Sequence, residues 1–207
     1  MDDVLVRLSN ITKIYGKNKV LNQLNLEFRK KKAYLLVGEN GSGKTTILKV
    51  ILGLISYEGE RTITCNQIGY VPDSLHFPYY LTCYDFLYNL GLIKNISPEK
   101  IKKALEILSK EWEIYPHINK KIHECSKGTK QKLLIIQAML ANPDIYIFDE
   151  ALNGLDQNMQ LKLFDFIQAM KDAGKTIIIT SHYFSLYKKI VDQVIYLKEG
   201  KAYDQFN

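Results

Sequence analysis

The segment GENGSGKT at residues 38–45 contains the residue types that bind nucleotide phosphates. It fits the pattern G-x-x-x-x-G-K-[ST] and lies between an apolar, strand-like run and a helical pattern. Glycines allow backbone N–H groups to surround phosphates, Lys44 can reach the β- and γ-phosphates, and the Thr45 hydroxyl can bind Mg²⁺. The expected nucleotide-binding residues are Gly38, Glu39, Asn40, Gly41, Ser42, Gly43, Lys44, Thr45 and Thr46.

Two consecutive acids, Asp149 and Glu150, end the apolar run IYIFDE. Asp149 can hold Mg²⁺ through its water shell, and Glu150 can polarise the attacking water. His182 follows the next apolar run, in TSHY, where an imidazole can hydrogen-bond a γ-phosphate and the water. We therefore expect Glu150 and His182 to be catalytic, and Thr45 and Asp149 to bind the metal.

The elements that must position these residues alternate between strands and helices. Short buried strands are predicted in AYLLVG, IYIFDE and KTIIITSH, with helices after the glycine-rich turn and in MQLKLFDFIQAMKDAG, which Gly174 closes. This alternation implies right-handed crossovers and a parallel sheet covered on both faces. Ligands bind outside the carboxyl ends of such strands, and every candidate group above falls at one of those ends.

The predicted fold class is therefore α/β, a P-loop NTPase with a mostly parallel central sheet and two smaller parts. VLVRLS and LNQLNLEF predict strands of a small antiparallel edge subdomain, which the short linker after the P-loop helix should leave trimmed. An inserted α-helical subdomain is expected at about residues 74–123, with its clearest helix in SPEKIKKALEILSK, where Ser97 takes the N-cap position. A C-terminal hairpin should turn at Glu199-Gly200. We expect one domain over residues 1–207.

Composition places the chain among ordinary globular proteins. It has 207 residues, 46% of them hydrophobic, and a net charge of +6 that permits contact with nucleic acid or an anionic membrane. The basic residues are spread along the chain, and the longest basic run, Arg29 to Lys32, is expected to be a solvated hairpin turn. Three cysteines make a disulfide framework improbable and predict a reduced, intracellular location. No signal peptide or membrane-spanning run is visible in the sequence.

Together these motifs resemble the nucleotide-binding subunit of ABC transporters, the ATP-binding-cassette ATPases. The resemblance covers essentially the whole chain, and the motifs occur in the family's order. By this resemblance Tyr15 stacks on adenine, although an ordinary strand tyrosine is the alternative, and Asp156 ends a turn, ALNGLD, that crosses a dimer interface. CSKGTKQKL resembles the family signature, which binds the nucleotide of the opposite subunit. Its residues in trans would be Ser126, Lys127, Gly128 and Thr129.

Two positions depart from the family pattern. After GYVP the family usually has a glutamine that touches Mg²⁺, whereas this chain has Asp73, which can still coordinate the metal but cannot donate a hydrogen bond. The signature, usually Leu-Ser-Gly-Gly-Gln, has Lys127 and Thr129 at its third and fifth positions. Ser126 sits where an N-cap belongs, and Lys127 is expected to preserve a positive field that favours a phosphate. Signatures with this lysine modestly favour export over import.

The resemblance implies an ATPase that uses ATP and Mg²⁺ and powers a separate transmembrane partner, as an exporter on the cytoplasmic face of the membrane. A second copy of the chain, or a related ATPase subunit, would complete a dimer, and no nucleic acid partner is expected. The aromatic-rich run LHFPYYLTCYDFLY either receives a helix of the membrane partner or forms the core of the helical insertion. The alternative function is an ABC-type ATPase with a non-transport mechanical or regulatory role.

Overall fold

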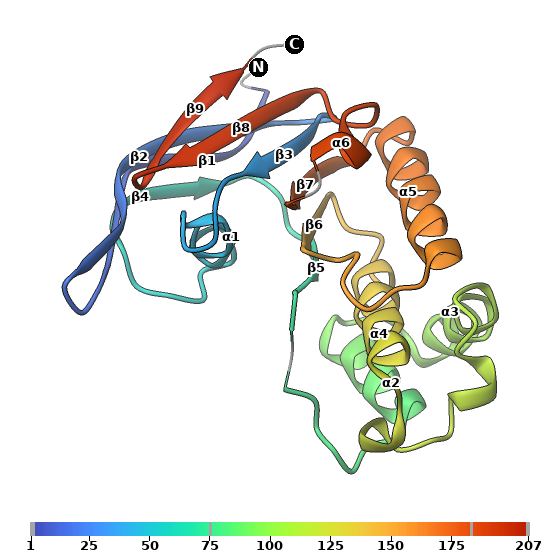
Figure 1. Cartoon of the computed structure of the whole chain (residues 1–207). Helices are drawn as coiled ribbons and strands as arrows, with labels where there is room; N and C mark the ends of the chain where they lie inside the picture. The colour runs from blue at the N-terminus through green and yellow to red at the C-terminus, as the bar shows by residue number, and fades with distance from the viewer. Residues whose placement is uncertain (1–2, 75, 183, 206–207) are drawn as a thin grey trace.

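A central six-stranded sheet organises the protein, whose computed structural model describes residues 3–74, 76–182 and 184–205. Neighbouring strands are parallel, except that the last strand pairs antiparallel with the one before it. This arrangement confirms the predicted mostly parallel α/β sheet (Figure 1). In spatial order the strands are β5 (Ile68–Val71), β6 (Ile145–Asp149), β7 (Thr176–Thr180), β3 (Ala33–Val37), β8 (Gln193–Lys198) and β9 (Lys201–Gln205).

Each central strand is apolar on both faces because both faces are covered. In β6, Ile145 and Ile147 face one core cluster while Tyr146 and Phe148 face the other, as strand alternation requires. Helix α1 (Lys44–Leu52) and a second sheet cover the first face. Helices α4 (Lys127–Met139) and α5 (Gln157–Asp172) cover the opposite face (Figure 1).

The second sheet has three antiparallel strands in the order β2 (Asn18–Arg29), β1 (Val4–Tyr15) and β4 (Glu58–Ile63). The prediction of a hairpin at Arg29 to Lys32 is wrong. These four residues are exposed, but they carry the chain from β2 in this sheet to β3 in the central sheet, and those two strands do not pair. The strand before the turn forms its hydrogen bonds with β1 instead.

Most helices and turns begin and end where local sequence signals place them. Asp156 Oδ1 accepts a hydrogen bond from Met159 N at the start of α5, and Gly174 closes that helix with a φ of 78°. Glu199 and Gly200 both have positive φ values in the predicted turn between β8 and β9. A short helix, α6 (Phe184–Tyr187), follows β7.

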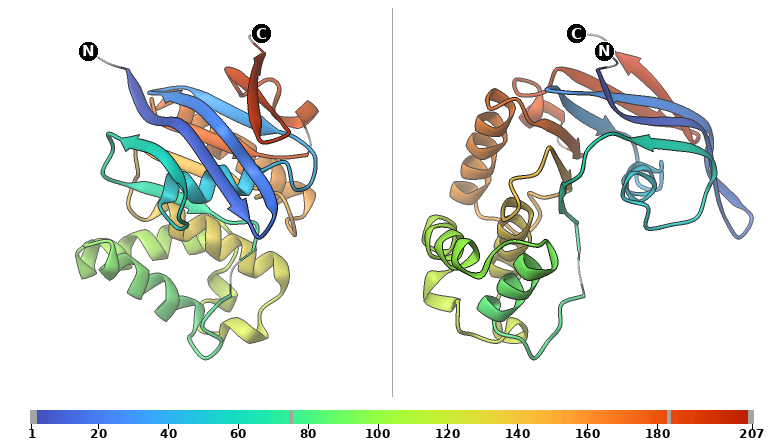
Figure 2. Two further views of the ribbon diagram at one scale, coloured as in Figure 1. Left: turned by 90° about the vertical axis from the view of Figure 1, so that its left-hand side faces the viewer. Right: turned by 180° about the vertical axis from the view of Figure 1, so that it is seen from behind.

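The segment between β5 and α4 is helical and lies to one side of both sheets (Figure 2). It contains α2 (Cys83–Ile93), α3 (Pro98–Glu111) and the short 3-10 turns η1 (Tyr115–His117) and η2 (Ile122–Glu124). Trp112 is fully buried and meets Phe166 of α5 edge to face, which attaches this segment to the central core. Across the described ranges, no helix has both the length and the apolarity needed to cross a bilayer.

Candidate nucleotide-binding site

The glycine-rich turn between β3 and α1 has the geometry of a phosphate cradle. Gly41 and Gly43 adopt φ values of 81° and 104°, which side chains disfavour. A Cβ on Gly38 would lie 2.4 Å from Ser42 Oγ, and one on Gly43 would lie 2.9 Å from a methyl group of Leu21. Among the described residues, the buried Ser42 Oγ has no hydrogen-bond partner, although buried hydroxyls are normally paired. A bound oxygen-rich group would supply that partner.

Lys44 is the first residue of α1, and its side chain turns back over the loop. Its Nζ donates hydrogen bonds to the carbonyl oxygens of Gly38 at 2.7 Å and Glu39 at 3.1 Å. Burial lowers the pKa of this ammonium, while the nearby charges of Glu150 and Asp149 oppose that shift. A buried cation that donates its hydrogen bonds to neutral carbonyls gains electrostatic energy when phosphate oxygens approach.

Asp149, at the end of β6, is a buried carboxylate that three hydroxyl groups surround. Its Oδ1 accepts from Thr180 Oγ1 at 2.5 Å and from Thr45 Oγ1 at 3.2 Å. The Tyr70 hydroxyl lies 3.5 Å from Oδ2, and burial followed by the charge of Asp149 raises the pKa of Tyr70. The topology therefore brings together the ends of β5, β6 and β7 and the start of α1, as expected for ligand sites in parallel sheets.

The oxygen atoms at this point fit Mg²⁺. Mg²⁺ usually takes one or two protein oxygens and completes its shell with waters and phosphate oxygens, and the adjacent Thr45 hydroxyl and Asp149 carboxylate supply such a pair. In the described part of the chain, no group of three or more His, Cys, Asp or Glu side chains could hold a metal ion. Waters and the phosphate oxygens of a nucleotide would complete the coordination of Mg²⁺ at this pair.

Glu150 adopts a left-handed backbone conformation immediately after β6, with a φ of 48°. Such a conformation is costly for a residue other than glycine and is common at functional sites. Its N–H donates to Thr180 Oγ1 at 3.1 Å and lies 3.2 Å from the Thr180 carbonyl oxygen. Glu150 Oε1 lies 3.2 Å from His182 Nε2. Burial raises the pKa of Glu150, and the charges of His182 and Lys44 partly lower it again.

A hollow of about 450 Å³ lies against the P-loop and extends to Glu150 and His182. Its wall also includes Tyr15, a residue that is 46% exposed. Lys13 Nζ lies 4.9 Å from the centre of the Tyr15 ring. The lining residues are Tyr15, Asn18, Val20, Asn40, Gly41, Gly43, Lys44, Thr45, Thr46, Asp73, Glu150, Asn153 and His182. Ser126 and the rest of the signature are not among them, although the signature residues are all described.

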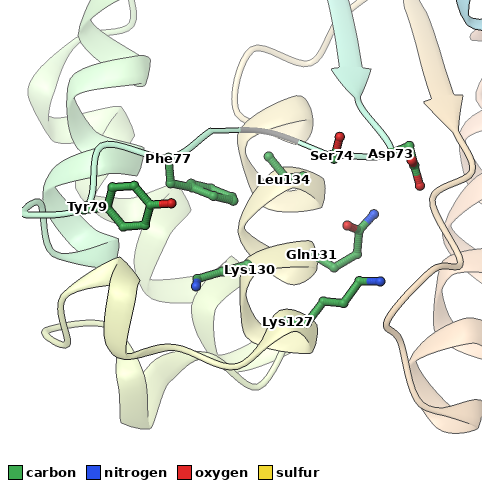
Figure 3. Close-up of a pocket in the computed structure, with 8 residues that line it drawn as sticks. All are labelled: Asp73, Ser74, Phe77, Tyr79, Lys127, Lys130, Gln131 and Leu134. Carbon is green, nitrogen blue, oxygen red and sulfur yellow. The ribbon is translucent and has the colours of Figure 1, made fainter.

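Asp73 lines both this hollow and a second one of about 170 Å³, whose lining residues Figure 3 shows. Its Oδ1 accepts a hydrogen bond of 2.8 Å from Asn153 Nδ2 in the turn after β6. A glutamine at position 73 would have a longer side chain and could itself donate to a neighbouring group. The carboxylate therefore connects two segments that come from different strands, and its metal-binding role stays a prediction.

The signature residues lie at the start of α4. Ser126 takes the N-cap position, and its Oγ accepts a hydrogen bond of 3.1 Å from Thr129 N. Ser126 and Thr129 line a separate hollow of about 220 Å³. The Lys127 side chain points toward the turn after β6 (Figure 3), where its aliphatic carbons would lie 3.2–3.4 Å from a Cβ on Gly154. Lys127 therefore lies beside the turn of its own chain. That its positive charge attracts a phosphate stays a prediction.

Besides Asn18 and Val20, which line the hollow, four residues that hold the site's side chains or turns were missed from the sequence. Thr180 and Tyr70 surround Asp149, Asn153 holds Asp73, and the buried Gln131 donates from α4 to the carbonyl oxygen of Ala151 at 3.1 Å. Thr180 carried a usable signal, because it stands two residues before His182 at the end of the same strand. The other three depend on contacts between segments that are distant in the sequence.

Comparison with known proteins identifies the family. Residues 21–153 match the family model described as ABC transporter. The uncharacterized ABC transporter ATP-binding protein MJ1023 of Methanocaldococcus jannaschii is 34% identical, over 95% of this chain and 75% of that protein. The lantibiotic transport ATP-binding protein SrtF of Streptococcus pyogenes is 31% identical, over 95% of this chain and 88% of the length of SrtF. The zinc import ATP-binding protein ZnuC of Yersinia pestis is also 31% identical, over 96% and 78%.

Solved structures agree with the sequence comparison. An ATP-binding cassette solved as a dimer in a post-hydrolysis state with ADP and Pi is 25% identical, with a TM-score of 0.85 over 97% of this chain and 98% of that chain. The ATP-binding subunit of another ABC transporter shares the fold with a TM-score of 0.89, at 24% identity over 98% of this chain and 90% of that chain. The chain therefore belongs to the ABC transporter family, in which it is an ATP-binding and ATP-hydrolysing subunit.

Proposed function

We propose that two copies of this cassette, or this cassette and a related subunit, close head to tail around two ATP molecules and thereby drive export through a separate membrane partner. One observation carries this proposal. The phosphate-binding and water-activating groups line a single hollow, while the signature of the same chain caps a helix outside it. A second chain can place its own signature against that hollow.

Within one subunit, each group has a distinct task. Lys44 and the P-loop N–H groups bind the β- and γ-phosphates, and Tyr15 stacks on the base. Glu150 accepts a proton from the attacking water at a carboxylate oxygen, and His182, 3.2 Å from that carboxylate, orients the water and the γ-phosphate. Thr45 and Asp149 would hold Mg²⁺, which would neutralise the charge that builds up on the phosphates.

The second subunit would complete the site with the N-terminal end of its α4. Ser126 and Gly128 would contact the γ-phosphate, because N–H groups in the first turn of a helix and an N-cap hydroxyl bind anions. The turn that ends at Asp156 would lie at the same interface. Closure would then depend on the γ-phosphate, and its loss would allow opening.

The helical insertion, about residues 74–123 of the single cassette, is the proposed contact with the membrane partner at the cytoplasmic face. It exposes large apolar side chains, including Tyr80 at 86% and Ile93 at 75% exposure. Aromatic and aliphatic anchors of this kind suit a partner helix. Among the relatives, SrtF is named for lantibiotic transport and ZnuC for zinc import, so the lysine-bearing signature is what favours export. Because the basic residues are dispersed along the chain, we expect no nucleic acid partner.

The proposed dimer predicts a specific effect of Glu150→Gln. This variant should bind Mg²⁺–ATP, hydrolyse it slowly and accumulate as a dimer, which light scattering coupled to gel filtration would detect. Adding Lys44→Ala is the matched control, because a dimer held by ATP should then disappear. A Glu150→Gln monomer with normal turnover would refute the model.

The direction of transport needs a separate test. In inside-out vesicles that contain the membrane partner, ATP should drive substrate into the lumen, whereas movement out of the lumen would refute export.

A further inference from the structure

Two of the three cysteines meet beside the signature. Cys83 is the first residue of α2, Cys125 immediately precedes Ser126, and their Sγ atoms lie 3.5 Å apart. Both are free thiols in this structure. A disulfide requires sulfur atoms at about 2.05 Å, so the pair is one small side-chain movement of about 1.5 Å from bonding distance. The third cysteine, Cys65, packs against the other core cluster.

The backbone around this thiol pair is already held in place. Cys83 N donates to the carbonyl oxygen of Lys120 at 3.0 Å, and Ile122 N donates to the carbonyl oxygen of Leu81 at 3.0 Å. An isolated bridge also pairs Thr82 with Lys121. These contacts fix the start of α2 against the segment that leads to the signature, so the two sulfurs stay near each other without any large rearrangement.

The two thiols differ in access to solvent. Cys83 is fully buried, whereas Cys125 is partly exposed and lines the 220 Å³ hollow together with Ser126 and Thr129. Burial, followed by the hydrogen bond with Cys125, raises the pKa of Cys83 to about 12. Access therefore sets the order: a small oxidant reaches Cys125 first. Cys83 is kept mostly as the thiol by its raised pKa, but its sulfur lies 3.5 Å from that of Cys125 and is placed to react with the oxidised product.

We propose that Cys83 and Cys125 form a site of reversible oxidation that closes to a disulfide and switches off the ATPase. A hydroperoxide first oxidises Cys125, as the S–O bond forms and the O–O bond breaks, and the thiol proton leaves with the alcohol or water product. The Cys83 sulfur then attacks the Cys125 sulfenic acid, forming the S–S bond and releasing water. Two thiols thus lose two electrons, and the hydroperoxide is reduced. A dithiol reverses the change by thiol–disulfide exchange.

The functional consequence follows from the position of Ser126. A disulfide ties the residue before the N-cap of α4 to the start of α2, so the Ser126 hydroxyl can no longer adjust to a phosphate held by the opposite subunit. This loss of activity rests on the proposed role of Ser126 in trans, whereas formation of the disulfide does not.

The test uses Cys65→Ser, which keeps only the proposed pair, and treats the reduced protein with hydrogen peroxide. Intact mass should show the loss of two hydrogen atoms without a covalent dimer, and peptide mapping should link Cys83 to Cys125. ATPase activity should fall by at least about tenfold, equivalent to ~1.4 kcal/mol of lost transition-state stabilisation, and should return with dithiothreitol. With Cys83→Ser added, the protein with its thiols reduced should keep its full ATPase activity. Peroxide should then oxidise Cys125 no further than a sulfenic acid, which dimedone traps.

Three outcomes would overturn the proposal: two thiols that survive peroxide unchanged, a link between other partners, or a Cys83–Cys125 disulfide with unaltered ATPase activity. Reduced Ser126→Ala separates this proposal from the proposed dimer. If that variant keeps full activity, then Ser126 has no role in turnover and the proposed trans site fails, while the mass measurement still decides whether the disulfide forms.

Discussion

Replacing Thr180 by valine should destabilise the protein and impair catalysis, because one hydroxyl supports both acids that end β6. Thr180 Oγ1 donates to Asp149 Oδ1 at 2.5 Å and accepts from Glu150 N at 3.1 Å. Valine keeps the shape of the side chain and removes both hydrogen bonds. The Thr180 side chain is fully buried, and of the two groups that lose a hydrogen bond Asp149 is only 1% exposed and Glu150 is partly buried.

The expected cost follows from the two lost interactions. A hydrogen bond to a charged group contributes about 1.5–3 kcal/mol and a neutral one about 1 kcal/mol. Part of the second loss is recovered, because Glu150 N also lies 3.2 Å from the Thr180 carbonyl oxygen. We therefore expect the free energy of unfolding to fall by about 2–4 kcal/mol. Asp149 and Glu150 also lose their fixed orientation, so kcat should fall by about tenfold or more.

Thr176→Val is the matched control at the opposite end of the same strand. Thr176 is also buried, but its hydroxyl accepts a hydrogen bond of 3.0 Å from the backbone N of Lys31, a residue exposed to water. This change should cost about 0.5–1.5 kcal/mol and leave ATPase activity near the wild-type level. Urea unfolding with a constant m-value and steady-state ATP hydrolysis would measure both effects. Equal losses for the two variants would refute the assigned role of Thr180.

Two further predictions concern the acids that line the hollow. Burial raises the pKa of Glu150, so kcat should begin to fall on acidification at a pH above the range in which glutamate usually titrates. The charge of His182 lowers the same pKa, so His182→Gln should shift this acid limb of the kcat profile further toward neutral pH. A pH–rate profile measures the limb, and an unshifted limb in the variant contradicts the coupling. The Asp73–Asn153 hydrogen bond should couple the two residues, so the exchange of Asp73→Asn with Asn153→Asp should recover activity that each single change loses; additive losses in kcat would exclude the coupling.

Sequence reasoning succeeded where a local signal decides the structure. The P-loop, the buried strands that end at Asp149 and Thr180, the closure of α5 at Gly174 and the turn at Glu199-Gly200 all have short-range causes. Glycine conformations, helix caps and apolar runs act over a few residues, so they can be read without knowledge of the pairing partner. The family resemblance then implied the order of the site's parts.

Long-range contacts account for what the sequence could not predict. The exposed run from Arg29 to Lys32 looks the same whether its flanking strands pair or enter different sheets, because strand pairing is decided by the rest of the molecule. Asp73 and Asn153 are 80 residues apart in the sequence, and nothing local indicates their hydrogen bond. The position of Lys127 beside Gly154 depends likewise on how α4 packs against the turn after β6.

The contact between α4 and the turn after β6 has a consequence for how two subunits would share information. Gln131 donates to the Ala151 carbonyl oxygen, and Gly128 lies directly against Gly154, so one contiguous block contains both the signature and the residues that follow Glu150. In the proposed dimer, that block touches its own nucleotide at one end and the neighbour's at the other. A displacement of this block at one ATP molecule would then be transmitted to the second ATP molecule directly, without passing through the membrane partner.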